Sequence, residues 1–474
     1  MSRKPAFLHL LLSLCFVIFI TFSSVQGEYQ PQSSVPGFDC YRDFDSIVES
    51  LQAFDAEYPE LAQLSTIGNS WEGRPIYALT LTNEARIEDK PRLVLVSGLR
   101  ANAFAPVELS LRFAEKLLAD YGENSESGWL LDHFELHLIL LANPDGRARA
   151  EDQAIDGPEY ITWQNNTHNS CSSEDIGVRL NQNFPYEWRS SDACDPAYSG
   201  EFATSELETQ AIINYLQILS AQPKPILLLN LDSYKNEILS PYLSKPTADN
   251  PHLEDLYTLA EKIGYDTLSG PVRQGGDPSQ QPSFGTLVDY AYGTLGIPSL
   301  VFSMGDELAG GYTSYCWYFE EYLLERNINA LTRALKISAD PYHHSYGPEI
   351  EIGIVSQDIN RVIVEGSAND YLAWFGGADL YSQVQSVQYS IDLPPWHPEA
   401  DLQPVSGLVQ DADYDFISHF SLEIDYSSFT PGYHRIFLQA WDTEADGNSS
   451  NPGLIEAVDI FIPYQCFIPL VNSE

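Results

Sequence analysis

The chain has 474 residues, and 24 Lys and Arg stand against 67 Asp and Glu, which gives a net charge of -43 at pH 7. An apolar share of 44% with only 19% charged residues excludes a disordered acidic chain, because so much hydrophobic side chain would be buried. The length predicts about two or three domains. A surface this negative repels phosphate groups and anionic lipid, which argues against nucleic-acid binding and peripheral membrane attachment.

The N-terminus has the features of a secretory signal peptide over residues 1–27. Arg3 and Lys4 precede an apolar run over residues 6–21, and small residues follow up to a cleavage position near Gly27. The alternative is a membrane anchor, but the run is shorter than a spanning helix needs. We therefore expect a secreted, extracellular protein. Removal of Arg3 and Lys4 with the signal peptide leaves 22 basic against 67 acidic residues, a net charge of -45.

Five cysteines follow the predicted signal, which are Cys40, Cys171, Cys194, Cys316 and Cys466. Disulfides persist in the compartments that exported proteins reach, and an odd number of cysteines leaves one without a partner in the chain. Cys171 and Cys194 bracket a polar loop and are the expected pair. The pairing of the other three stays open, and the alternative is that all five are buried free thiols.

From residue 38 to residue 340, short apolar runs alternate with segments of helical period, the pattern of an α/β sheet domain. One helix is expected to begin at Pro106, because apolar residues recur after it at helical spacing. Another is expected to begin at Ser205, with Glu208 completing a capping box, and to bury Leu207. The expected strands are Tyr77–Thr82, Arg92–Ser97, Leu136–Leu141, Pro225–Leu231 and Ser299–Phe302.

After Pro341 the pattern changes to alternating apolar and polar residues between Gly, Pro and Asp turns, and no helical period is present. This pattern predicts an all-β sandwich module over residues 345–470. The expected strands include Arg361–Val364, Val387–Ile391, Phe420–Ile424 and His434–Ala440.

Three acidic or histidine-rich groups have spacings found in metal sites. On a strand, His133, Glu135 and His137 would share one face, as metal ligands do, and the alternative is the solvated face of an edge strand. Two runs in the β module place oxygen ligands as calcium loops do, with ordinary acidic turns as the alternative. They are Asp411-x-Asp413-x-Asp415 and Asp442-x-Glu444-x-Asp446-Gly447-Asn448.

Polar residues follow several of the expected strands, and the sequence contains neither Gly-x-Ser-x-Gly nor His-Glu-x-x-His. In open α/β sheets the ligand crevice lies beyond the carboxyl ends of the strands, so we expect the functional site there. The segments are Ser97-Gly98-Leu99-Arg100, Asn143-Pro144-Asp145-Gly146, Asp232-Ser233-Tyr234 and Ser303-Met304-Gly305.

Further motifs follow one another in order along the α/β segment. They are Ile67-Gly68-Asn69-Ser70-Trp71-Glu72-Gly73-Arg74-Pro75-Ile76, Asn143-Pro144-Asp145-Gly146, Gly177-Val178-Arg179-Leu180-Asn181-Gln182-Asn183-Phe184, and Tyr198-Ser199-Gly200 with Ser205-Glu206. In this order they resemble the zinc carboxypeptidases of the carboxypeptidase A type, over residues 38–340. The resemblance implies a mixed, twisted sheet flanked by helices, and a disulfide with the Cys171–Cys194 spacing.

Members of that family remove C-terminal residues with one zinc, which two His and one Glu hold, while a further Glu acts as general base. The resemblance puts Arg100 and Ala103 at the first two ligand positions and Asp232 at the third. It puts Ser303 at the position of the general base.

The positions that anchor substrate in the family also differ. Gln164 and Gln182 stand where the resemblance implies arginines, and Gln281 falls near the position of a mobile tyrosine. Asn181 and Tyr198 are retained as cleft positions. Loss of the two arginines removes the bidentate donors that recognise a terminal carboxylate.

A guanidinium group has no lone pair to offer a metal, and alanine has no donor atom. Asp232 alone does not make a catalytic zinc site, which takes three protein ligands. We therefore expect no cofactor. We also predict that Arg100 and Asp232 pair and fill the former metal position. The alternative is that Arg100 points to solvent.

Three functions are compatible with these residues. The first is a catalytically inactive, secreted homologue that binds peptide or another polymer, neutral or basic, through the former active-site cleft. The second is an active zinc carboxypeptidase, as the family implies. The third is a hydrolase with a rebuilt metal-free site, which would use Asp232, Ser303 or, after a shift in strand register, Asp306 or Glu307. The sequence does not predict an oligomeric state.

Overall fold

A computed structural model describes residues 33–86, 89–245, 250–265, 267, 273–274, 281–358, 360–370, 383–414, 416–427, 429–443 and 450–463. The predicted signal peptide and Cys466 lie outside these residues. Within them, no helix combines the length and the apolar character needed to cross a membrane.

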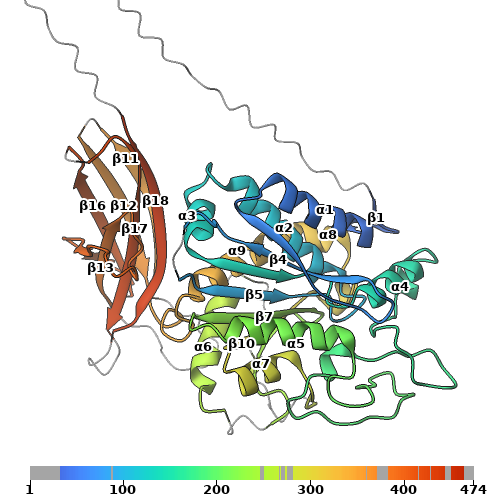
Figure 1. The fold of residues 1–474 in the computed structure, drawn as a ribbon. Helices are drawn as coiled ribbons and strands as arrows, with labels where there is room; N and C mark the ends of the chain where they lie inside the picture. The colour runs from blue at the N-terminus through green and yellow to red at the C-terminus, as the bar shows by residue number, and fades with distance from the viewer. Residues whose placement is uncertain are drawn as a thin grey trace, which may run out of the picture.

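The first domain is built on a twisted sheet of eight strands with helices on both faces (Figure 1). β6, β5, β7 and β10 run parallel, whereas β4 and β8 run antiparallel to their neighbours β6 and β10. The predicted mixed sheet is therefore confirmed. In spatial order the strands are β3 (Ala62–Asn69), β4 (Pro75–Leu81), β6 (Glu135–Ile139), β5 (Arg92–Val96), β7 (Ile226–Ser233), β10 (Ser299–Met304), β8 (Glu237–Ser240) and β9 (Arg273–Gln274).

Helices α1, α2 and α9 cover one face of this sheet, and α5 and α7 cover the other (Figure 1). A short ribbon of β1 (Ser34–Val35) and β2 (Phe38–Arg42) precedes α1. The α-helices are α1 (Phe44–Glu57), α2 (Phe104–Asp120), α3 (Ser125–His133), α4 (Pro144–Ala154), α5 (Leu207–Ser220), α6 (Leu253–Gly264), α7 (Leu287–Leu295), α8 (Cys316–Tyr318) and α9 (Leu324–Ile337). The shorter turns are the 3-10 helices η1 (Pro158–Tyr160), η2 (Leu180–Gln182) and η4 (Glu307–Ala309) and the π-helix η5 (Phe319–Leu323).

Alternate residues of the central strands enter the two cores, because successive side chains of a strand point to opposite faces. In β5, Leu93 and Leu95 pack on the side of α2, while Val94 and Val96 pack on the side of α5. Burial on both faces explains why the central strands are continuous apolar runs in the sequence.

Two details of the predicted helices are wrong. α2 begins at Phe104 rather than at Pro106. α5 begins at Leu207, which is 41% exposed, and Ser205 does not cap it. The Ser205 hydroxyl donates instead to Glu206 Oε1 at 2.6 Å, and Glu208 accepts from the Trp71 backbone N–H at 3.3 Å. A contact with the next residue and one with the distant Trp71 therefore replace the capping box.

The second domain is a sandwich of two antiparallel four-stranded sheets (Figure 1). Apolar residues at every second position of β12, β16, β17 and β18 form one core between the sheets, as the alternating pattern predicts. One sheet has the order β11 (Glu349–Gln357), β12 (Arg361–Asn369), β16 (Ile417–Asp425) and β15 (Val409–Gln410). The other has the order β14 (Gln403–Pro404), β13 (Gln383–Ile391), β17 (Gly432–Thr443) and β18 (Pro452–Ile462).

The two domains are in contact, and α3 and α9 lie against β18. Trp129 of α3 packs edge-on against Phe437 of β17, with ring centroids 6.0 Å apart. Arg435 Nη1 lies 3.1 Å from Asp132 Oδ2, and the buried Lys336 lies 2.5 Å from Glu456 Oε1. The sandwich is therefore packed against the α/β domain by apolar and ionic contacts together.

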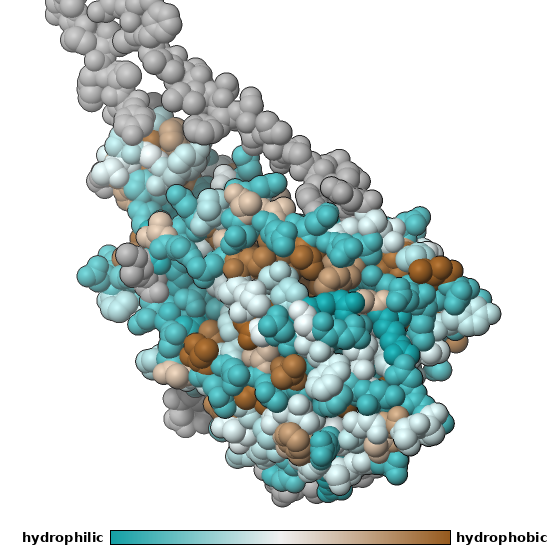
Figure 2. All heavy atoms as spheres, turned by 45° about the vertical axis from the view of Figure 1, so that its right-hand side comes forward, coloured by the Kyte–Doolittle hydropathy of each residue, from teal (hydrophilic) through white to brown (hydrophobic). Residues whose placement is uncertain are grey.

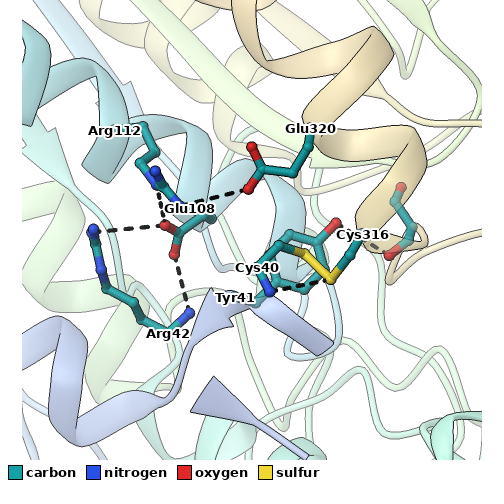
Figure 3. The surroundings of a disulfide bond; sticks show 8 residues. Cys40, Tyr41, Arg42, Glu108, Arg112, Cys316 and Glu320 are labelled. Carbon is teal, nitrogen blue, oxygen red and sulfur yellow. Dashed lines mark hydrogen bonds and ion pairs between the residues drawn. A yellow bond between two sulfur atoms is a disulfide. The ribbon is translucent and has the colours of Figure 1, made fainter. Parts of the chain in front are cut away.

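Two disulfides are present among the described residues. Cys171 and Cys194 form the expected bridge, with Cα atoms 4.9 Å apart. The second bridge joins Cys40 of β2 to Cys316 of α8, 276 residues away, and ties the start of the α/β domain to its last helices (Figure 3).

Figure 2 shows a face on which hydrophilic residues predominate and hydrophobic ones form scattered groups. Few of the acidic side chains among the described residues are buried. The charge excess is thus carried mainly by a solvated surface.

Candidate functional site

A cavity of about 710 Å³ opens beyond the carboxyl ends of β5, β7 and β10, where the polar strand ends predict the site. Its lining comes from these strand ends, from the loops around η2 and before α7, and from the segment after β10. The lining residues are Leu99, Arg100, Gln164, Arg179, Asn181, Gln182, Asp232, Ser233, Tyr234, Lys235, Glu237, Leu239, Leu243, Gln281, Ser283, Thr286, Val301, Ser303 and Tyr312.

Arg100 and Asp232, both in the lining of this cavity, make a two-point ion pair. Arg100 Nε donates to Asp232 Oδ1 at 3.0 Å, and Nη2 donates to Oδ2 at 3.1 Å. Parallel pairing of β5 with β7 brings the two strand ends side by side. The predicted pair is therefore present, and Arg100 does not simply point to solvent.

Three further groups hold this pair in place. Arg100 Nη1 donates to Gln164 Oε1 at 2.7 Å, the Ser233 N–H donates to Asp232 Oδ1 at 2.9 Å, and the guanidinium lies 4.6 Å from the centroid of the Tyr312 ring. Burial alone would lower the pKa of Arg100, but the charge and hydrogen bonds of Asp232 raise it. The arginine is thus a fixed cation.

The donor set at the three family ligand positions does not fit zinc. Arg100 offers only N–H donors, and both oxygens of Asp232 already accept hydrogen bonds from it. Ala103 is buried at the start of α2 and has no donor atom. In the part of the chain that the structure describes, no three His, Cys, Asp or Glu are arranged to hold a metal ion.

Ser303 occupies the end of β10 and lines the cavity, where its hydroxyl donates to the Tyr234 carbonyl. Asp306 and Glu307 are exposed and are not lining residues. Asp306 caps η4 by accepting from the Leu308 N–H at 2.7 Å. These acidic groups are therefore not brought to the cavity by a shift in register.

The structure brings four of the five predicted cleft positions to the cavity. Gln164, Asn181, Gln182 and Gln281 line it, and Asn181 Oδ1 also accepts from the Leu287 N–H at 3.0 Å. Tyr198 is buried outside the lining, where its carbonyl accepts from the Arg179 N–H at 2.7 Å.

Arg179 is a cavity residue whose role the sequence analysis missed. Its Nη2 donates to Pro196 O at 3.2 Å and lies 3.4 Å from Gln164 Oε1, and its Nε is buried without a partner among the described residues. Burial and then the charge of Arg100 lower the pKa of Arg179. The only sequence signal was its place in the motif Gly177-Val178-Arg179.

The cavity lining has a mixed charge. Its cations are Arg100, Arg179 and Lys235, and its carboxylates are Asp232 and Glu237. The lining is therefore less negative than the chain as a whole.

Both interpretations of the His133, Glu135 and His137 group are wrong. His133 is the last residue of α3, so the three residues do not share a strand. β6 lies between β4 and β5 rather than at an edge, and His137 is buried. His137 Nδ1 lies 2.9 Å from the Tyr215 hydroxyl, and Glu135 pairs with Arg92 at 2.8 Å.

The two calcium-like runs lie partly outside the described residues, which exclude Asp415, Glu444, Asp446, Gly447 and Asn448. In the first run, Asp411 Oδ1 accepts from the backbone N–H groups of Asp413 and Tyr414, and Oδ2 lies 3.0 Å from His419 Nε2. These contacts are those of an acidic turn.

A buried acidic cluster lies under the loop before β4. Glu206 Oε2 lies 3.0 Å from His168 Nδ1, and the His168 ring stacks on Trp71 at 3.7 Å. Asn166 Nδ2 donates to Glu206 at 2.8 Å and lies 3.5 Å from Glu208. Burial raises the pKa of Glu208 to about 7. Through Trp71 and Glu206 the cluster joins two of the ordered motifs.

Comparison with curated proteins finds carboxypeptidases. Carboxypeptidase A1 of Rattus norvegicus is 27% identical over 222 residues, which cover 46% of this chain and 50% of that protein. The inactive metallocarboxypeptidase ECM14 of Saccharomyces cerevisiae is 26% identical over 269 residues, which cover 54% of this chain and 61% of that protein. The chain spans about half the length of the carboxypeptidase A1 relatives that it matches.

Solved structures show the same fold. The crystal structure of thrombin activatable fibrinolysis inhibitor matches with a TM-score of 0.55 at 20% identity, over 63% of this chain and 74% of that chain. Carboxypeptidase A from Helicoverpa armigera matches with a TM-score of 0.54 at 20% identity, over the same shares. The sequence model of the zinc carboxypeptidase family matches residues 47–327, more than half of the chain. The chain therefore belongs to the zinc carboxypeptidase family.

Proposed function

We propose that this family member is catalytically inactive, lacks zinc and binds peptide or another polymer, neutral or basic, in the former active-site cleft. The observation that carries the proposal is the two-point contact between Arg100 and Asp232 at the positions where the family would hold its metal. A guanidinium there repels a dication, and the paired carboxylate has no oxygen left without a donor. Ser303 at the position that the resemblance assigns to the general base is a poor group to activate water.

The proposed ligand follows from the groups that remain. Gln164 and Gln182 offer amides where the resemblance implies arginine forks, and Tyr234 and Tyr312 add aromatic surface to the same lining. The net charge of the chain disfavours a polyanion. Arg179 has no ion pair within the described residues, so it is the lining group that a free carboxylate would contact. The binding test must therefore include a peptide with a free C-terminal carboxylate.

The first test combines metal analysis with an activity assay. Purified protein is dialysed against zinc, its metal content is measured, and hydrolysis of peptides ending in Phe and in Lys is followed. We expect far less than one zinc per chain and no release of the terminal residue. Stoichiometric zinc with chelator-sensitive cleavage would establish the second function instead, and cleavage without metal that Asp232→Ala abolishes would establish the third.

The second test compares a labelled neutral or Lys-containing decapeptide as its C-terminal amide and as its free acid. Both forms should bind with similar affinity, and Tyr312→Ala should weaken both. A free acid that binds tightly in the parent and weakly in Arg179→Gln would contradict the proposed ligand class.

We also propose that the chain is exported after cleavage near residue 27 and that its domains span residues 38–340 and 345–470. The two disulfides support export, because such bonds persist in oxidising compartments. The change from helices to strands between Ile337 and Glu349 supports the boundary.

A further inference from the structure

An exposed aromatic surface lies on the segment that follows the cavity wall. Trp317 is 54% exposed, Tyr315 is 46% exposed and Tyr322 is 43% exposed, and Tyr318 lies among them. We call these four residues the aromatic patch. It is separate from the cavity, since none of the four is a lining residue.

The rings of the patch support one another. Trp317 is edge-on to Tyr318 at 5.6 Å and to Tyr322 at 6.0 Å, while Tyr318 and Tyr322 stack at 5.6 Å with an interplanar angle of 24°. Mutual contact fixes the rings and still leaves about half of Trp317 open to solvent. An indole face in this state is the best of the side-chain surfaces for a cation.

The backbone under the patch is held from two sides (Figure 3). Cys316, at the start of α8, is bridged to Cys40 of β2. Glu320 of η5 lies 3.6 Å from Arg112 Nη2, and Arg112 also pairs with the buried Glu108 at 2.7 Å. A rigid support means that little ordering cost remains when a ligand binds.

The charge around the patch is mainly negative, and the cations beside it are Arg112, which pairs with Glu320, and Arg326. Residues 306–325 include Asp306, Glu307, Glu320, Glu321 and Glu325 and no Lys or Arg. All five are exposed. Burial raises the pKa of Tyr318, the charge of Asp306 raises it further, and the charge of Arg326 lowers it. Arg326 ends the segment. Aromatic faces and carboxylates both attract cations, so this surface selects a positive partner.

We propose that the aromatic patch is a docking site for an arginine- or lysine-rich segment of a partner protein, with cationic side chains over Trp317 and their neighbours on the surrounding carboxylates. This site is independent of the proposed ligand of the cavity. Because the whole chain is negative, any polycation is attracted to it, and the specific contribution of the patch must be isolated by matched variants.

The test measures the binding of fluorescently labelled octaarginine to the full chain by anisotropy. Trp317→Ala should weaken binding about two- to fivefold, the effect of one exposed cation–π contact, and Trp317→Ala with Tyr322→Ala should weaken it further. Trp71→Ala is the matched control, because Trp71 is 51% exposed and lies outside the patch. It should leave the affinity unchanged. Circular dichroism confirms that each variant is folded.

Three results would overturn the proposal. Equal affinities of the parent and Trp317→Ala would show that octaarginine responds to net charge alone. A loss in Tyr312→Ala as large as that in Trp317→Ala would place the peptide in the cavity. Binding of an uncharged Gly-Ser octapeptide or of cellohexaose as tight as that of octaarginine, and lost in Trp317→Ala, would show that the patch does not select cations.

Discussion

Arg100 and Asp232 face each other through two hydrogen bonds of 3.0 and 3.1 Å, one from each of two guanidinium nitrogens. Their side chains are only 23% and 16% exposed. Each group thus satisfies the other where water is scarce, and the loss of either leaves a partly buried charge.

Asp232→Ala should lower the free energy of unfolding by about 1–3 kcal/mol, because Arg100 then keeps its charge without its carboxylate. The double variant Arg100→Met with Asp232→Ala should lose less than the sum of the single variants Arg100→Met and Asp232→Ala. Urea unfolding of the parent and the variants completes the cycle. Strict additivity would mean that the contact contributes no coupling energy.

Replacement of the ligand positions by the family residues should create a zinc site. The triple variant Arg100→His, Ala103→Glu and Asp232→His should bind about one zinc per chain, since it restores the three donors that the resemblance implies at these positions. The single variant Asp232→His is the control, and it should not bind zinc, because Arg100 remains. Metal analysis after dialysis gives the result. A triple variant that is folded but free of zinc would show that the donors are not what excludes the metal.

Glu208 should make stability depend on pH. Burial raises its pKa to about 7 in the folded protein, and the unfolded value lies near 4.3, about that of a free glutamate. Between these values the folded state keeps a proton that the unfolded chain has lost, so this group destabilises the protein increasingly as pH rises through that window.

Glu208→Gln cannot ionise, so it should match the parent below about pH 4.5 and be more stable by up to about 3 kcal/mol above about pH 7. Denaturant unfolding at the two ends of this window measures the difference. A constant difference between the two proteins across the window would show that Glu208 does not titrate there.

Arg435 should contribute an ionic contact between the two domains. It reaches Asp132 at 3.1 Å and Asp459 at 2.6 Å, and its side chain is 19% exposed. Arg435→Ala should lower the free energy of unfolding by about 1–3 kcal/mol, because the buried Asp132 loses its ion-pair partner. Calorimetry should still show one unfolding transition, because Phe437 of the sandwich packs in the core of the α/β domain. Arg361→Ala, at an exposed pair with Asp358, is the control and should change little.

The sequence predicted the main strands and the Arg100–Asp232 contact for identifiable reasons. Strands β5 and β7 are buried on both faces, so continuous apolar residues mark them. The ordered motifs predicted that Arg100 and Asp232 stand at ligand positions of the family, and their opposite charges then predicted that the two side chains pair. By contrast, β8 and β9 contain too few residues to show a period.

Contacts between distant segments account for the remaining errors. His133 alternates with Glu135 and His137 in the sequence, but it is the last residue of α3, and its ring packs against Phe437, far away in the sequence, with centroids 5.7 Å apart. The Cys40–Cys316 pairing and the position of Arg179 beside Gln164 are likewise set by the fold. No local pattern contains such contacts.

The bridge between Cys40 and Cys316 has a consequence for how the protein is made. Its two halves are separated by almost the whole α/β domain, and a chain is synthesised from its N-terminus. Cys40 in β2 therefore cannot form this disulfide until residue 316 has been synthesised. A chain interrupted before that residue carries Cys40 as a free thiol, available to the wrong partner.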